Sequence, residues 1–150
     1  VLVLHDGIME WFDAEQCEFG YRSSVFHLHP DWIILAIKCK LNPKDPNDIK
    51  ELMDSRRKRR MDAQPLDFPS AVSVFRNPEV MPAWQLIEGI GYRGKMVGGA
   101  QVSEKHNNFI VNANKAKAID FITLVEDIQT KVKEKFDVDL IMEVEKFNWK

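Results

Sequence analysis

The apolar and polar positions at the start of the chain follow the pattern of a β-hairpin. Residues 1–12, VLVLHDGIMEWF, consist of two apolar runs on either side of an Asp-Gly pair. Asp-Gly favours the positive φ angles that a two-residue hairpin turn needs. The pattern therefore predicts two antiparallel strands, whose edges need a neighbouring strand or another cover.

A second β-prone run and an amphipathic segment follow. Residues 32–41, WIILAIKCKL, predict a strand that ends at Asn42-Pro43. Asp45-Pro46 predicts the start of a helix, because an Asp cap followed by proline at the first helical position is a common helix start. The apolar residues Ile49, Leu52 and Met53 form a narrow stripe on this helix, which we expect to finish in the basic run RRKRR, residues 56–60.

The second half of the chain predicts strands and helices in mixed order. Residues 61–70 are expected to form a connector. After it the sequence predicts a strand (71–76), a helix (82–90), two strands (95–102 and 109–112), a long helix (115–136) and a strand (138–147). In the long helix, apolar side chains recur every three or four residues, at Ala118, Phe121 or Ile122, Val125, Ile128, Val132 and Phe136. This order of elements indicates the α+β class.

Composition narrows the class of protein. The 150 residues suit one domain or two small ones, and 29% charged with 45% hydrophobic residues indicates a globular chain. A net charge of -2 gives no indication of a nucleic-acid partner. No apolar run approaches the ~20 residues of a membrane span, and no secretion signal is visible. We therefore expect a cytoplasmic protein with neither nucleic acid nor membrane as a partner.

Cysteine and histidine spacing predicts no metal site. Cys17 and Cys39 form no CxxC motif; they could pair with one another, but we expect both to be small buried thiols. The four histidines, at positions 5, 27, 29 and 106, lack the spacing of metal ligands.

The basic run at 56–60 has two readings. Clusters of Lys and Arg can contact nucleic acid, but cations near a helix C-terminus also interact favourably with the helix dipole. No aromatic residue is interleaved with these arginines, and the rest of the chain is acidic. The pattern favours a solvated helix end.

Two polar residues stand inside predicted strands. In PSAVSVFRNP, residues 69–78, alternation places Ala71, Ser73 and Phe75 on one face and Val72 with Val74 on the other. The Ser73 hydroxyl either bonds a nearby backbone carbonyl or takes part in chemistry, and the pattern leaves both readings open. Glu143, in DLIMEVEKF, is either a solvent-facing carboxylate or part of the same chemistry.

These segments together resemble one enzyme family. PSAVSVFRNP, LIEGIGYRGKMVGGAQVSEKHNNFIVN, a long helix ending in VKEKF and a late strand carrying Glu-Val resemble, in this order, the C-terminal half of the UDP-N-acetylenolpyruvoylglucosamine reductase (MurB) family. Upstream, FGYRSSVF resembles the family's Tyr-Arg-x-Ser segment, and QPLDFPSA resembles its linker into the last domain.

The resemblance implies a domain division and a set of cofactors. Residues 1–62 correspond to the end of a second FAD-binding subdomain, mostly β with one helix, and residues 63–150 to a small α+β substrate-binding domain. The family reduces UDP-N-acetylglucosamine enolpyruvate with FAD and NADPH in peptidoglycan synthesis. Nothing here resembles the upstream region that binds most of the FAD, so we expect a piece of a longer protein. Alone it should be inactive and free of FAD, and the FAD-binding portion should be its partner.

The resemblance also implies roles for six residues. Ser73 matches the proton-donating serine, Arg22 matches the cation that stabilises the developing negative charge, and Glu143 matches a glutamate that polarises the enolate. Tyr21 and Asn77 match positions near the substrate. Arg60, or its neighbour Arg59, matches a residue that meets the substrate phosphates.

The sequence departs from the family at several positions. Val72 replaces a glycine before the serine, and Met96 replaces a polar residue that can reach the substrate. Asp137 replaces a glycine after the long helix, and EVEKFNWK lacks a usual glycine. If the backbone at Val72 has a positive φ angle, a β-branched side chain there is strained. An alternative function is therefore a non-catalytic, diverged UDP-sugar-binding module, and a third is a nucleic-acid-binding piece that uses RRKRR.

Overall fold

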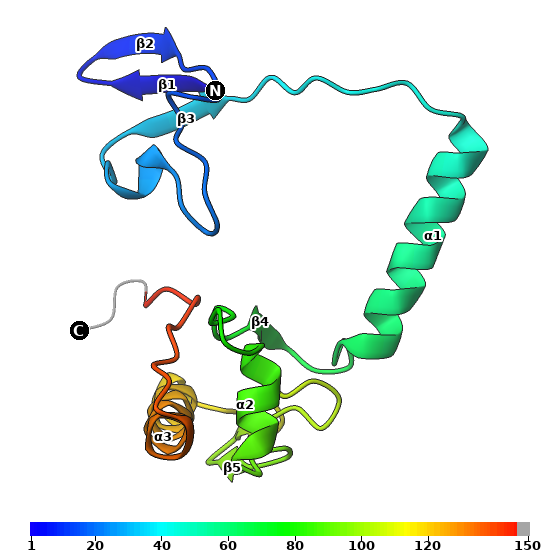
Figure 1. The fold of residues 1–150 in the computed structure, drawn as a ribbon, viewed down its shortest axis with the longest axis vertical. Helices are drawn as coiled ribbons and strands as arrows, with labels where there is room; N and C mark the ends of the chain where they lie inside the picture. The colour runs from blue at the N-terminus through cyan, green and yellow to red at the C-terminus, as the bar shows by residue number, and fades with distance from the viewer. Residues whose placement is uncertain (147–150) are drawn as a thin grey trace. The chain divides into compact units, whose positions relative to one another are not determined.

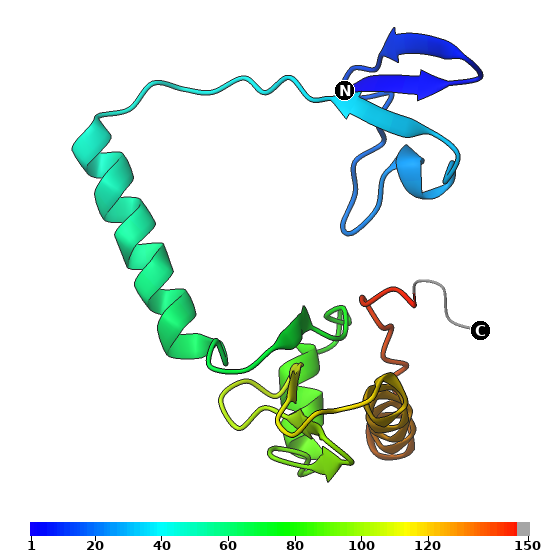
Figure 2. The ribbon, with the colours of Figure 1, turned by 180° about the vertical axis from the view of Figure 1, so that it is seen from behind.

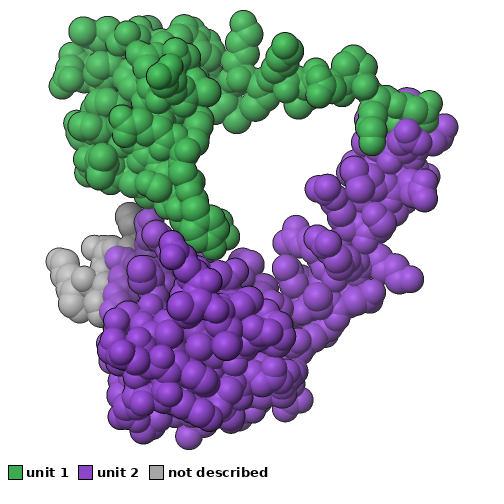
Figure 3. All heavy atoms as spheres, viewed as in Figure 1, with its two compact units in different colours: residues 1–45 green, residues 46–150 purple. Residues whose placement is uncertain are grey.

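The computed structural model describes residues 1–146 and divides the chain into two compact units. Unit 1 comprises residues 1–45 and unit 2 begins at Pro46 (Figure 3, green and purple). The fold class is α+β, as predicted: the described residues contain two antiparallel sheets and three α-helices (Figures 1 and 2).

Unit 1 contains a three-stranded sheet in the order β2-β1-β3. The predicted hairpin is confirmed: β1 (Leu2–His5) pairs with β2 (Ile8–Trp11). Asp6 and Gly7 form the turn with φ angles of 50° and 75°, as the Asp-Gly pair predicts. The strand predicted over 32–41 is too long, because β3 covers only Ile33–Ala36. Its one neighbour in the described chain is the four-residue β1, so pairing ends where β1 ends.

A small aromatic cluster fills the interior of unit 1. Val3 and Cys17 are fully buried. Trp32 contacts the rings of Phe12 and His5 at centroid distances of 5.4 and 4.9 Å. Cys17 is thus buried as expected, but the expectation for Cys39 is wrong, because this residue is exposed after β3 has ended.

Helix α1 (Pro46–Ala63) begins at the predicted proline, and none of its 18 residues is buried. It continues three residues beyond the basic run, so the predicted connector starts later than residue 61. The helical hydrogen bonds continue to Gln64, whose N–H bonds the Arg60 carbonyl at 2.9 Å, and Pro65 follows. The basic run is therefore exposed and reaches the last turn of the helix at Arg60, which agrees with a solvated helix end.

Unit 2 also contains a four-stranded sheet, in the order β4-β7-β6-β5. Its strands are β4 (Ser70–Ser73), β5 (Met96–Val97), β6 (Ala100–Val102) and β7 (Phe109–Asn112). The single strand predicted over 95–102 is wrong: Val97 pairs with Ala100 around Gly98, whose φ is 53°. Only a positive φ angle allows so tight a reversal, and glycine adopts it without strain.

Two helices complete unit 2. Helix α2 (Ala83–Gly89) and helix α3 (Ala118–Phe136) contact one another, and α3 also contacts β5 and β6 (Figures 1 and 2). The predicted buried face of α3 is largely confirmed, with Ile122, Leu124, Val125, Ile128 and Val132 buried. With Val74, Phe75, Leu86 and Ile87 they form part of one continuous core. No described helix is long and apolar enough to cross a membrane.

The strand predicted over 138–147 is not formed in its described part. Residues 138–146 make a single bridge, between Met142 and Phe75. Two backbone hydrogen bonds flank this bridge, from Arg76 N–H to the Ile141 carbonyl at 2.9 Å and from Glu143 N–H to the Val74 carbonyl at 2.8 Å. The segment therefore pairs with residues 74–76, directly after β4, over too few residues to form a strand, and residue 147 lies outside the described residues.

Candidate functional site

Ser73 lies at the end of a bulge in β4. Ser70 pairs with Val111 and Ser73 pairs with Phe109, so two residues of β4 lie opposite the single residue between them in β7. A bulge breaks the two-residue alternation of side chains. The predicted common face of Val72 and Val74 is therefore wrong: Val72 is 53% exposed, whereas Val74 and its neighbour Phe75 are both buried.

The Ser73 side chain is half-buried. Among residues 1–146 we find no hydrogen bond made by its hydroxyl, so the structure does not support the reading in which it bonds a nearby carbonyl. A half-buried hydroxyl without a protein partner can donate its proton to a bound molecule.

Glu143 lies alongside the residue that follows Ser73. The hydrogen bond from its N–H to the Val74 carbonyl, 2.8 Å long, brings together two segments that are distant in the sequence. The Glu143 side chain is half-buried, which is intermediate between a solvent-facing carboxylate and a buried one. The structure thus places two of the three predicted catalytic residues in neighbouring segments of unit 2.

Asn108 fixes the backbone beyond Ser73, and sequence analysis did not single it out. Its buried carboxamide accepts a hydrogen bond from Phe75 N–H at 3.0 Å and donates one to the Phe75 carbonyl at 2.8 Å. The Asn-Asn pair at 107–108, directly before an apolar strand, was the available signal, because a buried carboxamide needs such partners.

His106 begins the turn that carries Asn108. Its Nδ1 accepts a hydrogen bond from Asn108 N–H at 3.2 Å, and its ring meets the Phe109 ring edge-on at 4.7 Å. Burial lowers the pKa of the imidazole below its usual value of 6.5. The neutral ring therefore keeps the acceptor that Asn108 N–H requires.

The predicted substrate-binding residues of unit 2 lie on its surface. Asn77 is exposed, and its Oδ1 accepts a hydrogen bond from Ala83 N–H at 3.0 Å, at the start of α2. Arg60 is exposed on α1 and donates from Nε to Gln64 Oε1 at 3.4 Å. It lines a surface hollow of about 550 Å³ together with Met53, Arg56, Arg57, Met61 and Leu66. Two arginines beside Arg60 make this hollow cationic.

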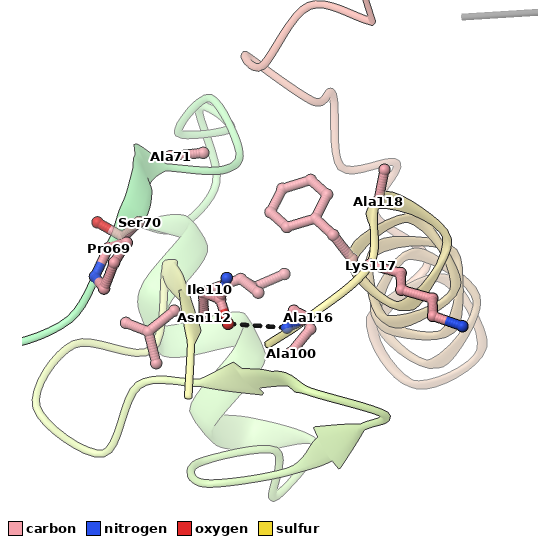
Figure 4. Close-up of a pocket in the computed structure, with 11 residues that line it drawn as sticks. Pro69, Ser70, Ala71, Ala100, Ile110, Asn112, Ala116, Lys117 and Ala118 are labelled. Carbon is pink, nitrogen blue, oxygen red and sulfur yellow. Dashed lines mark hydrogen bonds between the residues drawn. The ribbon is translucent and has the colours of Figure 1, made fainter. Parts of the chain in front are cut away.

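A second hollow, of about 370 Å³, lies between β4 and the start of α3 (Figure 4). Ser70 and Ala71 line it, and Asn112 Oδ1 accepts a hydrogen bond from Ala116 N–H at 2.8 Å across its floor. Figure 4 shows the Lys117 side chain extending away from it. Ser73 does not line this hollow.

Tyr21 and Arg22 lie at the tip of a tight turn in unit 1. The turn is closed by the backbone bonds Gly20 N–H to Ser23 O (2.9 Å) and Ser23 N–H to Gly20 O (3.3 Å). Arg22 adopts a φ of 53°, and its guanidinium carbon lies 5.9 Å from the centre of the Tyr21 ring. Both side chains are exposed. A site shared by Arg22 and Ser73 stays a prediction.

Two glycines of the run at 91–99 pack closely against other atoms of unit 2. A Cβ on Gly99 would collide with the backbone of Asn114 and Ala116, and one on Gly98 with the Asp120 carboxyl group. These two glycines allow close packing within unit 2. Residues 1–146 contain no group of three or more His, Cys, Asp or Glu that could hold a metal ion.

Comparisons with known proteins agree with the resemblance seen in the sequence. The profile of the UDP-N-acetylenolpyruvoylglucosamine reductase C-terminal domain matches residues 64–147. A protein named UDP-N-acetylenolpyruvoylglucosamine reductase from Carboxydothermus hydrogenoformans is 48% identical over 93% of this chain and 46% of its own length. A reductase of the same name from Bacillus subtilis is 38% identical over 96% of this chain and 48% of its own length.

A solved structure shares the fold. The crystal structure of the reductase from Thermus caldophilus superimposes with a TM-score of 0.80 at 35% identity, covering 96% of this chain and 50% of that one. The chain thus spans about half the length of these relatives.

Proposed function

The chain belongs to the UDP-N-acetylenolpyruvoylglucosamine reductase family, and from this premise we propose that it is the substrate-binding half of such an enzyme. The reaction would be the NADPH-dependent reduction of UDP-N-acetylglucosamine enolpyruvate to UDP-N-acetylmuramate, in the cytoplasm, for peptidoglycan synthesis. The proposal rests on the position of Glu143, which lies beside Val74, the residue that follows Ser73. The Ser73 hydroxyl has no hydrogen-bond partner among the described residues. In the proposed domain division, residues 1–62 end the FAD-binding region and residues 63–150 bind the substrate; the family match from residue 64 supports this boundary.

Ser73 is the proposed proton donor. Reduction of the enolpyruvyl double bond leaves negative charge on the carbon next to the carboxylate, and this carbon must receive a proton. A serine hydroxyl has a high pKa in water, but it can protonate so basic a centre when held within about 3 Å of it. The bulge in β4 leaves the Ser73 hydroxyl without a hydrogen bond to any other described residue, which keeps its proton available.

Arg22 and Glu143 are proposed to stabilise the charge that develops. The Arg22 guanidinium is always charged, and its planar fork matches the two oxygens of a carboxylate. Glu143 would polarise the enolate oxygen, the role that the family match implies for it. Tyr21, Asn77 and Arg60 are proposed to bind the substrate, with Arg60 at its phosphates beside the cationic surface of α1.

The residues of this chain do not fit the role of principal FAD holder. At Gly98 and Gly99 the space beside the backbone is taken by Asp120 and by the backbone of Asn114 and Ala116, so these two glycines offer no open cradle for a diphosphate. A reduced flavin supplies hydride chemistry when bound. We therefore assign most of its contacts to the part of the longer family proteins that this chain does not match, with NADPH as co-substrate.

The test combines the chain with the unmatched half of the Carboxydothermus relative and FAD. We expect NADPH oxidation that depends on the enolpyruvyl sugar. Glu143→Ala should lower kcat by roughly 10²–10³-fold, as expected for loss of one preorganised polar group. Glu145→Ala is the matched control, because Glu145 is exposed in the same segment. Equal rates for the two variants would refute the role of Glu143, and absence of turnover in the combined wild type would refute the reductase proposal.

A second candidate function is a UDP-sugar-binding module without catalysis. The exposed side chains of Val72 and Met96, at 53% and 45%, favour it, because they replace a glycine and a polar residue of the family. Isothermal titration with UDP-N-acetylglucosamine separates the two functions. Binding without any turnover of the combined protein would establish the module, whereas turnover that depends on the enolpyruvyl group would exclude it.

A further inference from the structure

Val72 has an unusual backbone conformation for its residue type. Its φ angle is 64°, in the left-handed region. The other non-glycine residues with positive φ among the described residues are Asp6, Glu18, Arg22, Lys115 and Asp137. Val72 alone in this set is β-branched, and a β-branched side chain crowds the backbone most in this region.

The Val72 side chain itself does not offset this strain. The Val72 side chain is 53% exposed, so the conformation is not maintained by burial of its methyl groups. Asp137 provides a contrast. It ends α3 in the left-handed conformation, where a short polar side chain is tolerated, and its carboxylate pairs with Lys133 Nζ at 2.9 Å.

The backbone on both sides of Val72 determines its conformation. On one side, Asn112 N–H bonds the Pro69 carbonyl at 2.8 Å and Ser70 pairs with Val111. On the other, Val74 N–H bonds the Asn108 carbonyl at 2.8 Å. The two registers differ by one residue, so the chain between them must contain the bulge. Strained backbone persists where the surroundings over-determine it, and such residues concentrate at functional sites.

We infer that the left-handed backbone at Val72 is a positioning device for Ser73. The bulge absorbs the extra residue of β4 and turns Ser73 out of the regular alternation, so that its hydroxyl is half-buried without a protein partner. Val72 is thus a positioning residue that acts through Ser73. The catalytic consequence of this inference rests on the proposed function, whereas its structural content does not.

The first test measures thermal stability in the full chain. Val72→Gly and Val72→Asn should raise the Tm of the transition that includes unit 2 by about 4 °C, because both residues tolerate the left-handed region. Val72→Ile keeps the β-branch and should leave the Tm within about 1 °C of the wild type. A Tm lowered by Val72→Gly would overturn the inference, because glycine destabilises an unstrained strand position.

The second test reads the position of residue 73 without enzyme activity. Cys39→Ser removes the exposed thiol, and Cys17 is buried. In this background, Ser73→Cys introduces the one accessible thiol among the described residues. Its rate of reaction with a disulfide reagent should stay within about threefold when Val72→Gly is added. Val72→Pro cannot adopt a positive φ angle, and it should change this rate by about tenfold or more. An equal thiol reaction rate with and without Val72→Pro would overturn the inference. If the Val72→Pro variant does not fold, the stability test decides the inference.

The kinetic test separates this inference from the proposed function. In the combined reductase, Val72→Pro should lower kcat to about the level of Ser73→Ala, and the double variant should lose no more, as expected for residues that act as a unit. Fully additive losses would overturn the positioning role. Absence of turnover in the wild type, with the predicted Tm order and thiol rates, would refute the proposed function and leave the positioning of residue 73 established.

Discussion

The two units of the chain differ in how much of their structure their own residues determine. In unit 2, sheet and helices share one continuous core of buried side chains that extends from Val74 to Leu140. In unit 1, the fully buried hydrophobic residues are Val3 and Cys17, and every residue of β2 is exposed. Ser73 and Glu143 therefore lie on a packed scaffold, whereas Arg22 lies at the tip of a short turn.

This difference affects how precisely each unit can place a functional group. Catalytic side chains must be held within a fraction of an ångström by the residues around them. Asn108 and the segment containing Glu143 hold both sides of the backbone after Ser73. We therefore expect substitutions in the core of unit 2 to cost more free energy of unfolding than equivalent ones in unit 1 or on the exposed helix α1.

The largest expected difference comes from a matched pair of leucines. Leu124→Ala, in the core of unit 2, should lower the free energy of unfolding by about 2–5 kcal/mol, because it leaves a cavity. Leu35→Ala, on β3 where leucine is 45% exposed, should cost well under half of that. Denaturant unfolding of both variants measures the two values, and equal costs would contradict the difference between the units.

Asn108 gives the next largest effect, with its neighbour as the control. Asn108→Ala leaves the buried Phe75 N–H and carbonyl without their side-chain partner, and should cost about 1–3 kcal/mol. Asn107→Ala should cost less, since the Asn107 amide makes one long hydrogen bond, 3.4 Å, and its Oδ1 is unpartnered among the described residues. A reversed order, measured by denaturant unfolding, would show that Asn108 does not fix the backbone near Ser73.

His106 should make the stability of unit 2 depend on pH. Because burial lowers its pKa in the folded chain below 6.5, the neutral form is the one that folding favours. Its contribution is fully present above pH 6.5 and is lost as the pH falls through the lower, folded pKa. Unfolding measured across this range should show the loss, and His106→Gln should remove that part of the pH dependence. An unchanged pH profile in the variant would contradict the assignment.

The smallest effect is expected on α1. Leu52 is 44% exposed on a helix without a buried residue, so Leu52→Ala should change the free energy of unfolding by less than about 0.5 kcal/mol. A cost close to that of Leu124→Ala would mean that α1 packs against protein in solution.

Local sequence signals predicted elements whose geometry depends on nearby residues. The Asp6-Gly7 turn, the start of α1 at Pro46 and the strand at 109–112 all follow from residue preferences. The bulge at Val72 does not follow from local residue preferences. It results from the register between β4 and β7, which residues distant in the sequence determine. The prediction of a strand over 138–147 was wrong for the same reason. Its pairing depends on residues 74–76, which are distant in the sequence.

The candidate site was predicted less completely than the fold. No periodicity relates Ser73 to Glu143, and both were identified through the resemblance to the reductase family. The strain at Val72 was anticipated only as a consequence of replacing glycine, and the φ angle of 64° now confirms that condition. Asn108 was missed, because the partner of a buried carboxamide is a tertiary contact.

The most direct test of the account is the kcat of Ser73→Ala in the combined reductase, measured against Ser70→Ala. Ser70 is an exposed serine of the same strand, so its variant controls for the loss of a hydroxyl from β4. We expect Ser73→Ala to lower kcat by roughly 10²–10³-fold, while Ser70→Ala should retain most of the activity. Equal rates for the two variants would contradict the assignment of Ser73 as the proton donor.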